Sequence, residues 1–238
     1  MNIRYERQLA LDGFGEEAQR RLSAAKVLVV GAGGVGCALL PLLAGAGIGS
    51  ISIVDFDCVS LSNLARQTLY TQEQIGGAKA PLAAERLGKI NPEIKVVAHN
   101  KKIEKPADLS GLLPGIDMCI DATDSFASRL IVSDACADAS VDEILCSAEG
   151  FVSQMFLLGR GVKFSDIVGD DAARSQPAKK NPIFGPAAHL SGVWGAAAAL
   201  QILSGIRDFI PGFVQSYDFS DNKFLSFTIT ADESYQIE

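Results

Sequence analysis

The chain has 238 residues, 48% of them hydrophobic, and a formal net charge of −7. These values suit one large α/β domain with a buried sheet, and the negative charge argues against nucleic acid or an anionic membrane as the main partner. Residues 1–21 are charged and polar, unlike a signal peptide, and the apolar stretch at 193–203 is too short to cross a bilayer. We therefore expect a cytoplasmic protein with no nucleic-acid or membrane partner.

Apolar strands and helical segments alternate after an N-terminal helical leader at 1–25. The predicted strands are 27–30, 51–54, 95–100, 117–120, 141–146 and 154–158. The predicted helices are 34–46, 78–90 and 125–139. This alternation over 26–150 is typical of a Rossmann-like, doubly wound, mostly parallel sheet.

Residues 160–238 do not continue this alternation of strands and helices. Residues 160–186 are rich in glycine and proline and include Lys179 and Lys180, which favours a crossover loop. An Ala-rich helix is expected from 187 to 205, followed by a hairpin with strands at 215–218 and 223–230. Residues 187–238 would thus add an antiparallel extension within a single domain spanning 1–238.

A glycine-rich turn follows the first strand. Gly31, Gly33, Gly34 and Gly36 form G-x-G-x-x-G, and Asp55 ends the next strand nineteen residues later. Glycines allow a tight turn and close approach to phosphate at a helix N-terminus, and the carboxylate can accept hydrogen bonds from ribose hydroxyls. The pattern predicts an adenine nucleotide but does not separate ATP from NAD.

Charged residues after the fingerprint favour ATP. Arg66 and Lys79 are thirteen residues apart and supply the positive donors that a triphosphate needs. Asn63 can bond phosphate or ribose. Asp124 follows another strand and is the expected magnesium ligand, with Asp57 as a possible second one.

Several motifs together resemble the ThiF/MoeB/HesA family, the bacterial relatives of ubiquitin-activating enzymes. The chain opens with R-Y-x-R-Q at Arg4, continues through D-x-D-x-V-x-x-S-N-L-x-R-Q from Asp55 to Gln67, and has G-x-x-K-A around Lys79. The family's T-D-N turn reads Thr123-Asp124-Ser125. The resemblance runs from Arg4 to about Arg129 and resumes weakly at 185–205.

The resemblance implies a reaction and its residues. Family members use ATP to adenylate the C-terminal glycine of a small ubiquitin-fold sulfur-carrier protein ending in Gly-Gly, with release of pyrophosphate. The matching arginine, Arg7, acts from the other subunit of a homodimer, with Arg66, Lys79 and Asp124 as further catalytic residues. The implied ATP and magnesium site comprises Gly31, Gly33, Gly34, Gly36, Asp55, Asp57, Ser62, Asn63, Arg66, Gln67, Lys79, Asp124 and Ser125.

The sequence also departs from the family. It has no C-x-x-C pair, and residues 160–185 contain no cysteine, so we expect neither a zinc site nor a loop thioester. Sulfur would then come from a separate donor. Cys146 is predicted to be buried core, and Ser125 replaces an asparagine that could donate twice.

Other functions stay open at this point. The acceptor could be a peptide or a tRNA base, or the chain could be a nucleotide-binding partner without catalysis. An NAD-dependent oxidoreductase is the alternative at the level of the fold. The carrier and its pathway, whether thiamine, molybdopterin or amino-acid synthesis, are not specified by the sequence.

Overall fold

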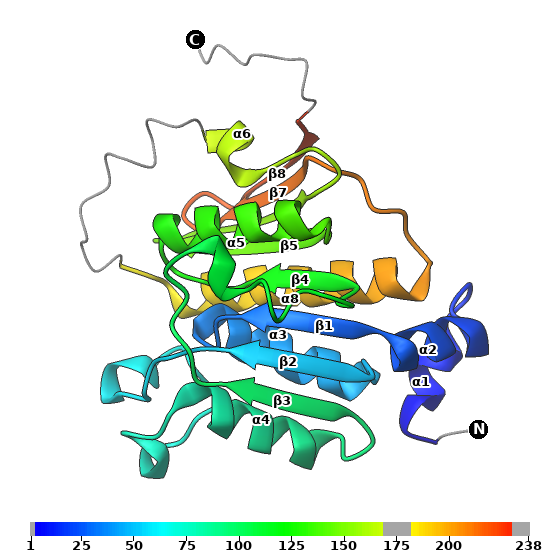
Figure 1. Cartoon of the computed structure of the whole chain (residues 1–238), viewed down its shortest axis with the longest axis horizontal. Helices are drawn as coiled ribbons and strands as arrows, with labels where there is room; N and C mark the ends of the chain where they lie inside the picture. Colours follow the sequence, from blue (N-terminus) through cyan, green and yellow to red (C-terminus); the bar gives the residue numbers. More distant parts are fainter. Residues whose placement is uncertain (1–2, 169–181, 230–238) are drawn as a thin grey trace.

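The computed structural model describes residues 3–168 and 182–229, and its centre is an eight-stranded sheet (Figure 1). The strands lie in the order β3-β2-β1-β4-β5-β6-β7-β8. Their bounds are β1 Lys26–Val30, β2 Ser50–Val54, β3 Lys95–His99, β4 Met118–Asp121, β5 Glu143–Glu149, β6 Val152–Leu158, β7 Phe213–Asp218 and β8 Lys223–Thr228. The helices are α1 Glu6–Leu9, α2 Gly15–Ala24, α3 Gly34–Ala46, α4 Lys79–Ile90, α5 Phe126–Ala139, α6 Phe164–Val168 and α8 Gly185–Ser204, with 3-10 turns η1 Ile3–Tyr5, η2 Leu61–Asn63, η3 Gln72–Gln74 and η4 Pro106–Asp108.

The first five strands are parallel and the last three are antiparallel. Val27 of β1 pairs with Ile51 of β2 on one side and with Met118 of β4 on the other. β5 continues the parallel part beside β4, whereas β6, β7 and β8 each run against their neighbour. The predicted fold class is therefore confirmed, including the antiparallel C-terminal extension.

Helices cover both faces of this sheet, because the central strands are apolar on both sides. One face packs against α3, α4 and α8 through residues such as Val29, Ile53 and Leu39. The other packs against α5, where Leu28 and Val30 meet Val132. Beyond it, Phe156 and Val214 pack against Phe164 of α6. Figure 1 shows α5 in front of the strands and α8 behind them.

The N-terminal helices lie at the amino ends of the strands. Asn91 donates to the Tyr5 hydroxyl at 2.9 Å, and Gln8 donates to the carbonyl of Ala46 at 2.9 Å. The second contact ties α1 to the C-terminal end of α3. Figure 1 shows α1 and α2 at the end of the sheet opposite to the strand arrowheads.

The predicted crossover loop at 160–186 is described only in part. Its beginning contains α6, a short helix that the sequence did not predict. Residues 169–181, with Lys179 and Lys180, lie outside the described residues. Gly150 accepts from Phe184 at 2.8 Å and donates to Pro182 at 2.9 Å, which fixes the start of α8 against the turn between β5 and β6.

Within 3–168 and 182–229, none of the helices combines the length and apolar character that crossing a bilayer requires.

Candidate nucleotide-binding and active site

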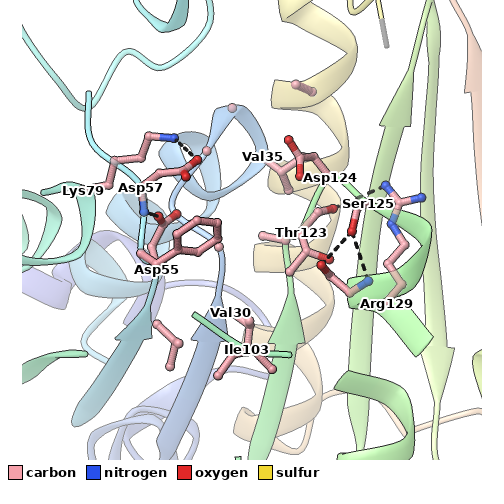
Figure 2. A pocket seen from close by; sticks show the side chains of 18 of the residues that line it. Val30, Val35, Asp55, Asp57, Lys79, Ile103, Thr123, Asp124, Ser125 and Arg129 are labelled. Carbon is pink, nitrogen blue, oxygen red and sulfur yellow. Dashed lines mark hydrogen bonds and ion pairs between the residues drawn. The ribbon is translucent and has the colours of Figure 1, made fainter. Parts of the chain in front are cut away.

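A cavity of about 460 Å³ lies at the carboxyl edge of the parallel strands. The chain leaves β1, β2 and β4 at Gly31, Asp55 and Ala122, and these residues lie side by side because Gly31 donates to Val54 and Ala122 donates to Val30, both at 2.8 Å. Ligands in open parallel sheets bind at this edge. Figure 2 shows Asp55, Asp57 and Lys79 on one side of the cavity and Thr123, Asp124 and Arg129 on the other. We call these two groups the β2 wall and the β4 wall.

The glycine turn closes the floor of the cavity. Gly31 has a φ of 103°, and a Cβ there would lie 2.6 Å from the carbonyl oxygen of Ala122. At Gly36 a Cβ would lie 2.4 Å from the carbonyl of Gly31, so this residue lets α3 approach the turn. Gly33 is the N-cap of α3. Free backbone N–H groups at this helix N-terminus can receive phosphate.

The β2 wall is held by internal bonds. The two carboxylate oxygens of Asp55 accept hydrogen bonds from the backbone N–H groups of Ala32 and Asp57, at 2.7 and 2.8 Å. Burial raises the pKa of Asp55, and these two hydrogen bonds oppose that rise. Lys79 begins α4, and its buried Nζ lies 3.0 Å from Oδ2 of Asp57, whose side chain is 52% exposed. The Lys79 side chain thus points into the cavity, where its partner is the half-exposed carboxylate of Asp57.

Arg66 and Gln67 come from the segment that follows η2, and both line the cavity. The Nε2 of His189 in α8 lies 2.8 Å from the carbonyl oxygen of Arg66, so this ring nitrogen carries a proton and donates. A Cβ at Gly34 would touch the Arg66 side chain at 3.3 Å and Ala188 at 3.2 Å. The aliphatic part of the Arg66 side chain therefore lies between the glycine turn and α8.

The β4 wall begins where β4 ends. Burial raises the pKa of Asp121, whose Oδ1 accepts from the backbone N–H of Thr123 at 2.8 Å. Ser125 is the N-cap of α5, and its hydroxyl accepts from the N–H of Ser128 at 3.1 Å. Arg129, one turn further along α5, is directed back toward β4 and donates to the carbonyl of Thr123 at 3.3 Å.

Several polar groups of this wall, Asp124 and Arg129 among them, have unused bonding capacity. In the part of the chain that the structure describes, the exposed Asp124 carboxylate makes no hydrogen bond or ion pair, and the buried Nε of Arg129 has no acceptor. Burial lowers the pKa of Arg129, whereas Asp121, Asp124 and Glu149 favour its charged form. An arginine side chain stays protonated in proteins, so the guanidinium is a cation that can receive an anionic group.

An apolar end completes the cavity. Val30, Val54, Ile103 and Val132 line it, which suits the flat face of a base. Phe56 stands at its rim with 52% of its surface exposed, and the Nζ of Lys102 lies 5.8 Å from its ring centroid.

Comparison with known proteins now identifies the family. A profile of the ThiF family matches residues 5–236. The chain belongs to the ThiF family.

Individual relatives agree with this assignment. A probable adenylyltransferase/sulfurtransferase MoeZ of Mycobacterium tuberculosis is 33% identical over 97% of this chain and 61% of the relative. A sulfur carrier protein adenylyltransferase of Thermus thermophilus is 34% identical over 95% of this chain and 86% of the relative. Among solved structures, E. coli MccB with ATP has a TM-score of 0.83 at 23% identity, covering 96% of this chain and 72% of that one, which supports the fold. The chain spans about three fifths of the length of the first curated relatives it matches.

Most of the residues predicted for the site meet in the cavity of this ThiF-family protein. The cavity is lined by Gly31, Gly33, Gly34, Asp55, Asp57, Arg66, Gln67, Lys79, Asp124 and Ser125.

Four predicted residues lie elsewhere. Gly36 packs beneath the turn, while Ser62 and Asn63 shape η2, where Asn63 accepts from the Ser60 N–H at 3.0 Å. Arg7 is exposed in α1, near the C-terminal end of α3. Because the 13 residues of α3 span about 20 Å, Arg7 lies far from the cavity of its own chain.

Sequence reasoning missed two cations at the cavity, Arg129 and Lys101. Arg129 could have been found, since it lies four residues after the N-cap Ser125 and therefore on the same helix face. Lys101 and Ile103 follow β3 in an irregular segment, and nothing in the sequence indicates where that segment lies.

The five cysteines differ in exposure. Cys37, Cys119, Cys136 and Cys146 are buried, and only Cys58 is exposed. Burial raises the pKa of Cys37 to about 12 and raises that of Cys146 as well. A Cβ on Gly195 would lie 2.3 Å from the Cys146 sulfur, so this thiol fills the space beneath α8, as predicted.

Proposed function

We propose that this chain is an ATP-dependent adenylyltransferase that activates the C-terminal glycine of a small ubiquitin-fold sulfur-carrier protein. The observation that carries the proposal is the cavity itself, which is lined by Arg66, Lys79 and an Asp124 carboxylate that makes no hydrogen bond or ion pair among the described residues. Dinucleotide sites rely mainly on backbone N–H groups for phosphate, whereas this cavity adds side-chain cations, among them Arg66 and Lys79. Relatives named as sulfur-carrier and molybdopterin-synthase adenylyltransferases support the same function.

The shape of the cavity suggests how ATP binds. Adenine would occupy the apolar end beside Val54 and Ile103, and Asp55 would accept hydrogen bonds from the ribose. The phosphates would then extend over the N-terminus of α3 toward Arg66 and Lys79. Both cations lower the cost of gathering negative charge there, and Lys79 would exchange Asp57 for phosphate.

The β4 wall fits a magnesium ion. The Asp124 carboxylate faces the cavity, is exposed, and is not used by another described residue. Carboxylate and phosphate oxygens are the ligands that Mg²⁺ prefers. Asp124 would hold the ion, with bound magnesium neutralising charge on the phosphates. Asp57 is the weaker candidate because it already pairs with Lys79.

The reaction needs no general base from the protein. A carboxylate oxygen of the acceptor attacks the α-phosphorus, a new acyl O–P bond forms, and the bond from the α-phosphorus to the bridging oxygen of pyrophosphate breaks. The electron pair leaves with pyrophosphate. The protein's contribution is to position two anions against each other and to offset their charge with Arg66 and Lys79.

We further propose that Arg7 acts in a partner's cavity within a homodimer. Its exposed side chain at the far end of α3 is out of reach of its own cavity but free to enter another. An arginine supplied in trans stabilises charge that builds up on phosphate during transfer. Since every cysteine but Cys58 is buried, sulfur would reach the acyl-adenylate from a separate donor.

ATP–pyrophosphate exchange tests the proposal. The protein is incubated with magnesium, labelled pyrophosphate, ATP and a panel of small ubiquitin-fold proteins, each with and without its terminal Gly-Gly. We expect exchange with one intact carrier and none with its truncated form. Exchange that is equal with both forms, or absent across the panel, would reject a carrier glycine as the acceptor.

A further inference from the structure

One buried hydroxyl, that of Tyr70, contacts both the glycine turn and the start of α4. Tyr70 lies between η2 and η3 with 5% of its surface exposed. Its Oη donates to the carbonyl oxygen of Ala32 at 2.9 Å and lies 3.4 Å from the carbonyl oxygen of Lys79. Burial raises the pKa of Tyr70, so the hydroxyl keeps its proton and remains a donor. No step of the proposed reaction uses this group, although it touches two segments that supply residues to the cavity.

Hydrogen bonds hold Ala32 at both of its peptide groups. Its N–H donates to Oδ2 of Asp55 at 2.7 Å, and its carbonyl accepts from Tyr70. This carbonyl shares a peptide group with the N–H of Gly33, and in a trans peptide the two point in opposite directions. Tyr70 is buried, whereas Gly33 lines the cavity. The carbonyl is therefore directed into the protein, and the Gly33 N–H is directed toward the cavity.

The Gly33 N–H is available to a ligand. Within 3–168 and 182–229, no group of the protein accepts a hydrogen bond from it. Gly33 is the N-cap of α3, where the helix dipole and unpaired N–H groups favour an anion. A phosphate group of the nucleotide is the anion that the proposed binding mode brings to this point.

Gly33 also permits the opposite orientation of this peptide group. Its φ is −79°, and turning the peptide over would make φ positive, which glycine adopts without steric cost. The N–H of Ala32 would keep its bond to Asp55, because only the following peptide group rotates. The other donor near the Ala32 carbonyl, the thiol of Cys37 at 3.8 Å, is a weak one. In the turned peptide the carbonyl would face the cavity and repel phosphate oxygens.

We infer that Tyr70 is a positioning residue that holds the peptide group between Ala32 and Gly33 with its N–H toward the phosphates of the nucleotide. This inference rests on the nucleotide-binding part of the proposed function and adds to it a residue that touches neither substrate. The second contact of the hydroxyl ties the first residue of α4, Lys79, to the same turn. One donor thus sets both a backbone and a side-chain group that receive phosphate.

Tyr70→Phe removes the hydroxyl and keeps the ring. Binding of magnesium-ATP to the full chain is measured by calorimetry, and we expect the Kd to rise about tenfold, because the turned peptide then competes with the binding-competent one. With a carrier that supports exchange, the KM for ATP should rise by the same factor. The kcat should stay within twofold, because bound phosphate selects the competent orientation.

Tyr5→Phe is the matched control. Tyr5 is 6% exposed, and its hydroxyl accepts from Asn91 at 2.9 Å at the amino ends of the strands, away from the cavity. Both variants lose a buried hydroxyl and should lower the melting temperature by similar amounts. Tyr5→Phe should leave the Kd for magnesium-ATP within twofold. An equal loss of ATP affinity in the two variants would reduce the role of Tyr70 to general stability and overturn the inference.

A double-mutant cycle with Gly33→Ala tests the turned peptide itself. A Cβ at Gly33 would lie 3.7 Å from Nε2 of Gln67, so alanine fits the observed conformation, but alanine resists the positive φ of the turned one. Tyr70→Phe should therefore change ATP affinity less than twofold in the Gly33→Ala background. Gly33→Ala alone should weaken binding, because its methyl group stands where phosphate approaches, so the cycle compares ratios within each background. A tenfold effect in both backgrounds would contradict the inference.

A crystal structure of Tyr70→Phe without nucleotide reads the peptide directly and does not depend on the affinity of Gly33→Ala. The Ala32 carbonyl should face the cavity in part or all of the molecules. An unchanged orientation would overturn the inference, as would magnesium-ATP affinity within twofold of the unmodified protein, and pyrophosphate exchange with a carrier would then still support adenylation. A tenfold loss of affinity with a turned peptide, but no exchange with any carrier, would keep the role of Tyr70 and reject the carrier as acceptor. Absence of magnesium-ATP binding by the unmodified protein would reject both.

Discussion

The two walls of the cavity at the carboxyl edge of the parallel strands differ in how their charges are balanced. In the β2 wall, Lys79 pairs with Asp57 at 3.0 Å and both oxygens of Asp55 accept backbone hydrogen bonds. In the β4 wall, the carboxylate of Asp124 and the Nε of Arg129 find no partner among the described residues. The β2 wall is thus held by bonds within the protein, whereas the β4 wall keeps bonding capacity that is available to the proposed substrates.

This difference agrees with a division of labour between the walls. Groups that bind phosphate gain from being fixed in advance, because no reorganisation is then needed during the reaction. Groups that meet the acceptor and a metal ion must remain free until both arrive. Single-residue variants test this difference, and the expected loss of activity or ATP affinity decreases from Arg7 through Asp124 to His189.

The largest effect is expected at a residue that belongs to neither wall. Arg7→Ala should lower carrier-dependent exchange by roughly a thousandfold, as expected for an arginine that neutralises transition-state charge. Its exposed position in α1 predicts an unchanged melting temperature. Activity within tenfold of the unmodified protein would show that Arg7 has no role in the site.

Mixing two inactive variants tests whether Arg7 acts in trans. Arg7→Ala and Asp124→Ala are each inactive in this view, but a heterodimer of the two contains one complete site. Random exchange of subunits should therefore restore about a quarter of the activity, since half of the dimers are mixed and each has one working site. No recovery in mixtures shown to exchange subunits would rule out action across a dimer.

The second prediction compares the carboxylates of the two walls. Asp124→Asn should reduce exchange by roughly a hundredfold and raise the magnesium concentration for half-maximal rate, because a charged ligand is lost. Asp57→Asn should cost less than about tenfold and leave the magnesium dependence unchanged, because Asp57 only orients Lys79. A magnesium shift in Asp57→Asn would instead make Asp57 a ligand.

A smaller effect is expected at His189, which holds the backbone of Arg66. His189→Ala removes the hydrogen bond of 2.8 Å to the Arg66 carbonyl and should weaken binding of magnesium-ATP about fivefold. His189→Gln keeps a donor and should restore most of the affinity, with kcat nearly unchanged in both. If alanine and glutamine variants bind ATP equally, the contact does not position Arg66.

The cysteines should show no catalytic effect. Burial raises the pKa of Cys37 to about 12 and raises that of Cys146, while a hydrogen bond with Cys136, together with burial, raises that of Cys119. These thiols therefore remain protonated and unreactive near neutral pH. Alkylation of the native protein should modify Cys58 alone, as read by mass spectrometry, and Cys146→Ala should retain exchange. Loss of exchange in a folded Cys146→Ala variant would point to a covalent role.

Local patterns were sufficient to predict the parallel strands and the glycine turn. The periodicity of apolar residues, the apolar runs and the spacing of glycines are all properties of residues that are close in the sequence. The strand predicted at 141–146 instead continues to Glu149, and the strand predicted at 154–158 begins at Val152. Their extra residues pair across the turn at Gly150. Such cross-strand pairing extends both strands beyond the segments predicted from the sequence.

The candidate site was predicted less completely than the fold. The positions of the strand ends and the family motif predicted that Asp55, Lys79 and Asp124 belong to one site. A motif does not show, however, which of its residues face the cavity. Asn63 is used within η2, and Arg129 enters the site only because the N-cap at Ser125 sets the direction of α5. These roles depend on contacts between segments that are distant in the sequence.

The products formed from ATP and a carrier provide the most direct test of the central claim. After incubation with magnesium, the carrier that supports exchange is analysed by intact mass, and the nucleotides are separated by chromatography. Attack of the terminal carboxylate on the α-phosphorus predicts AMP and pyrophosphate, together with a carrier that bears one adenylyl group at its final glycine. Formation of ADP and phosphate, or an adenylyl group on a carrier without its Gly-Gly, would contradict the proposed chemistry.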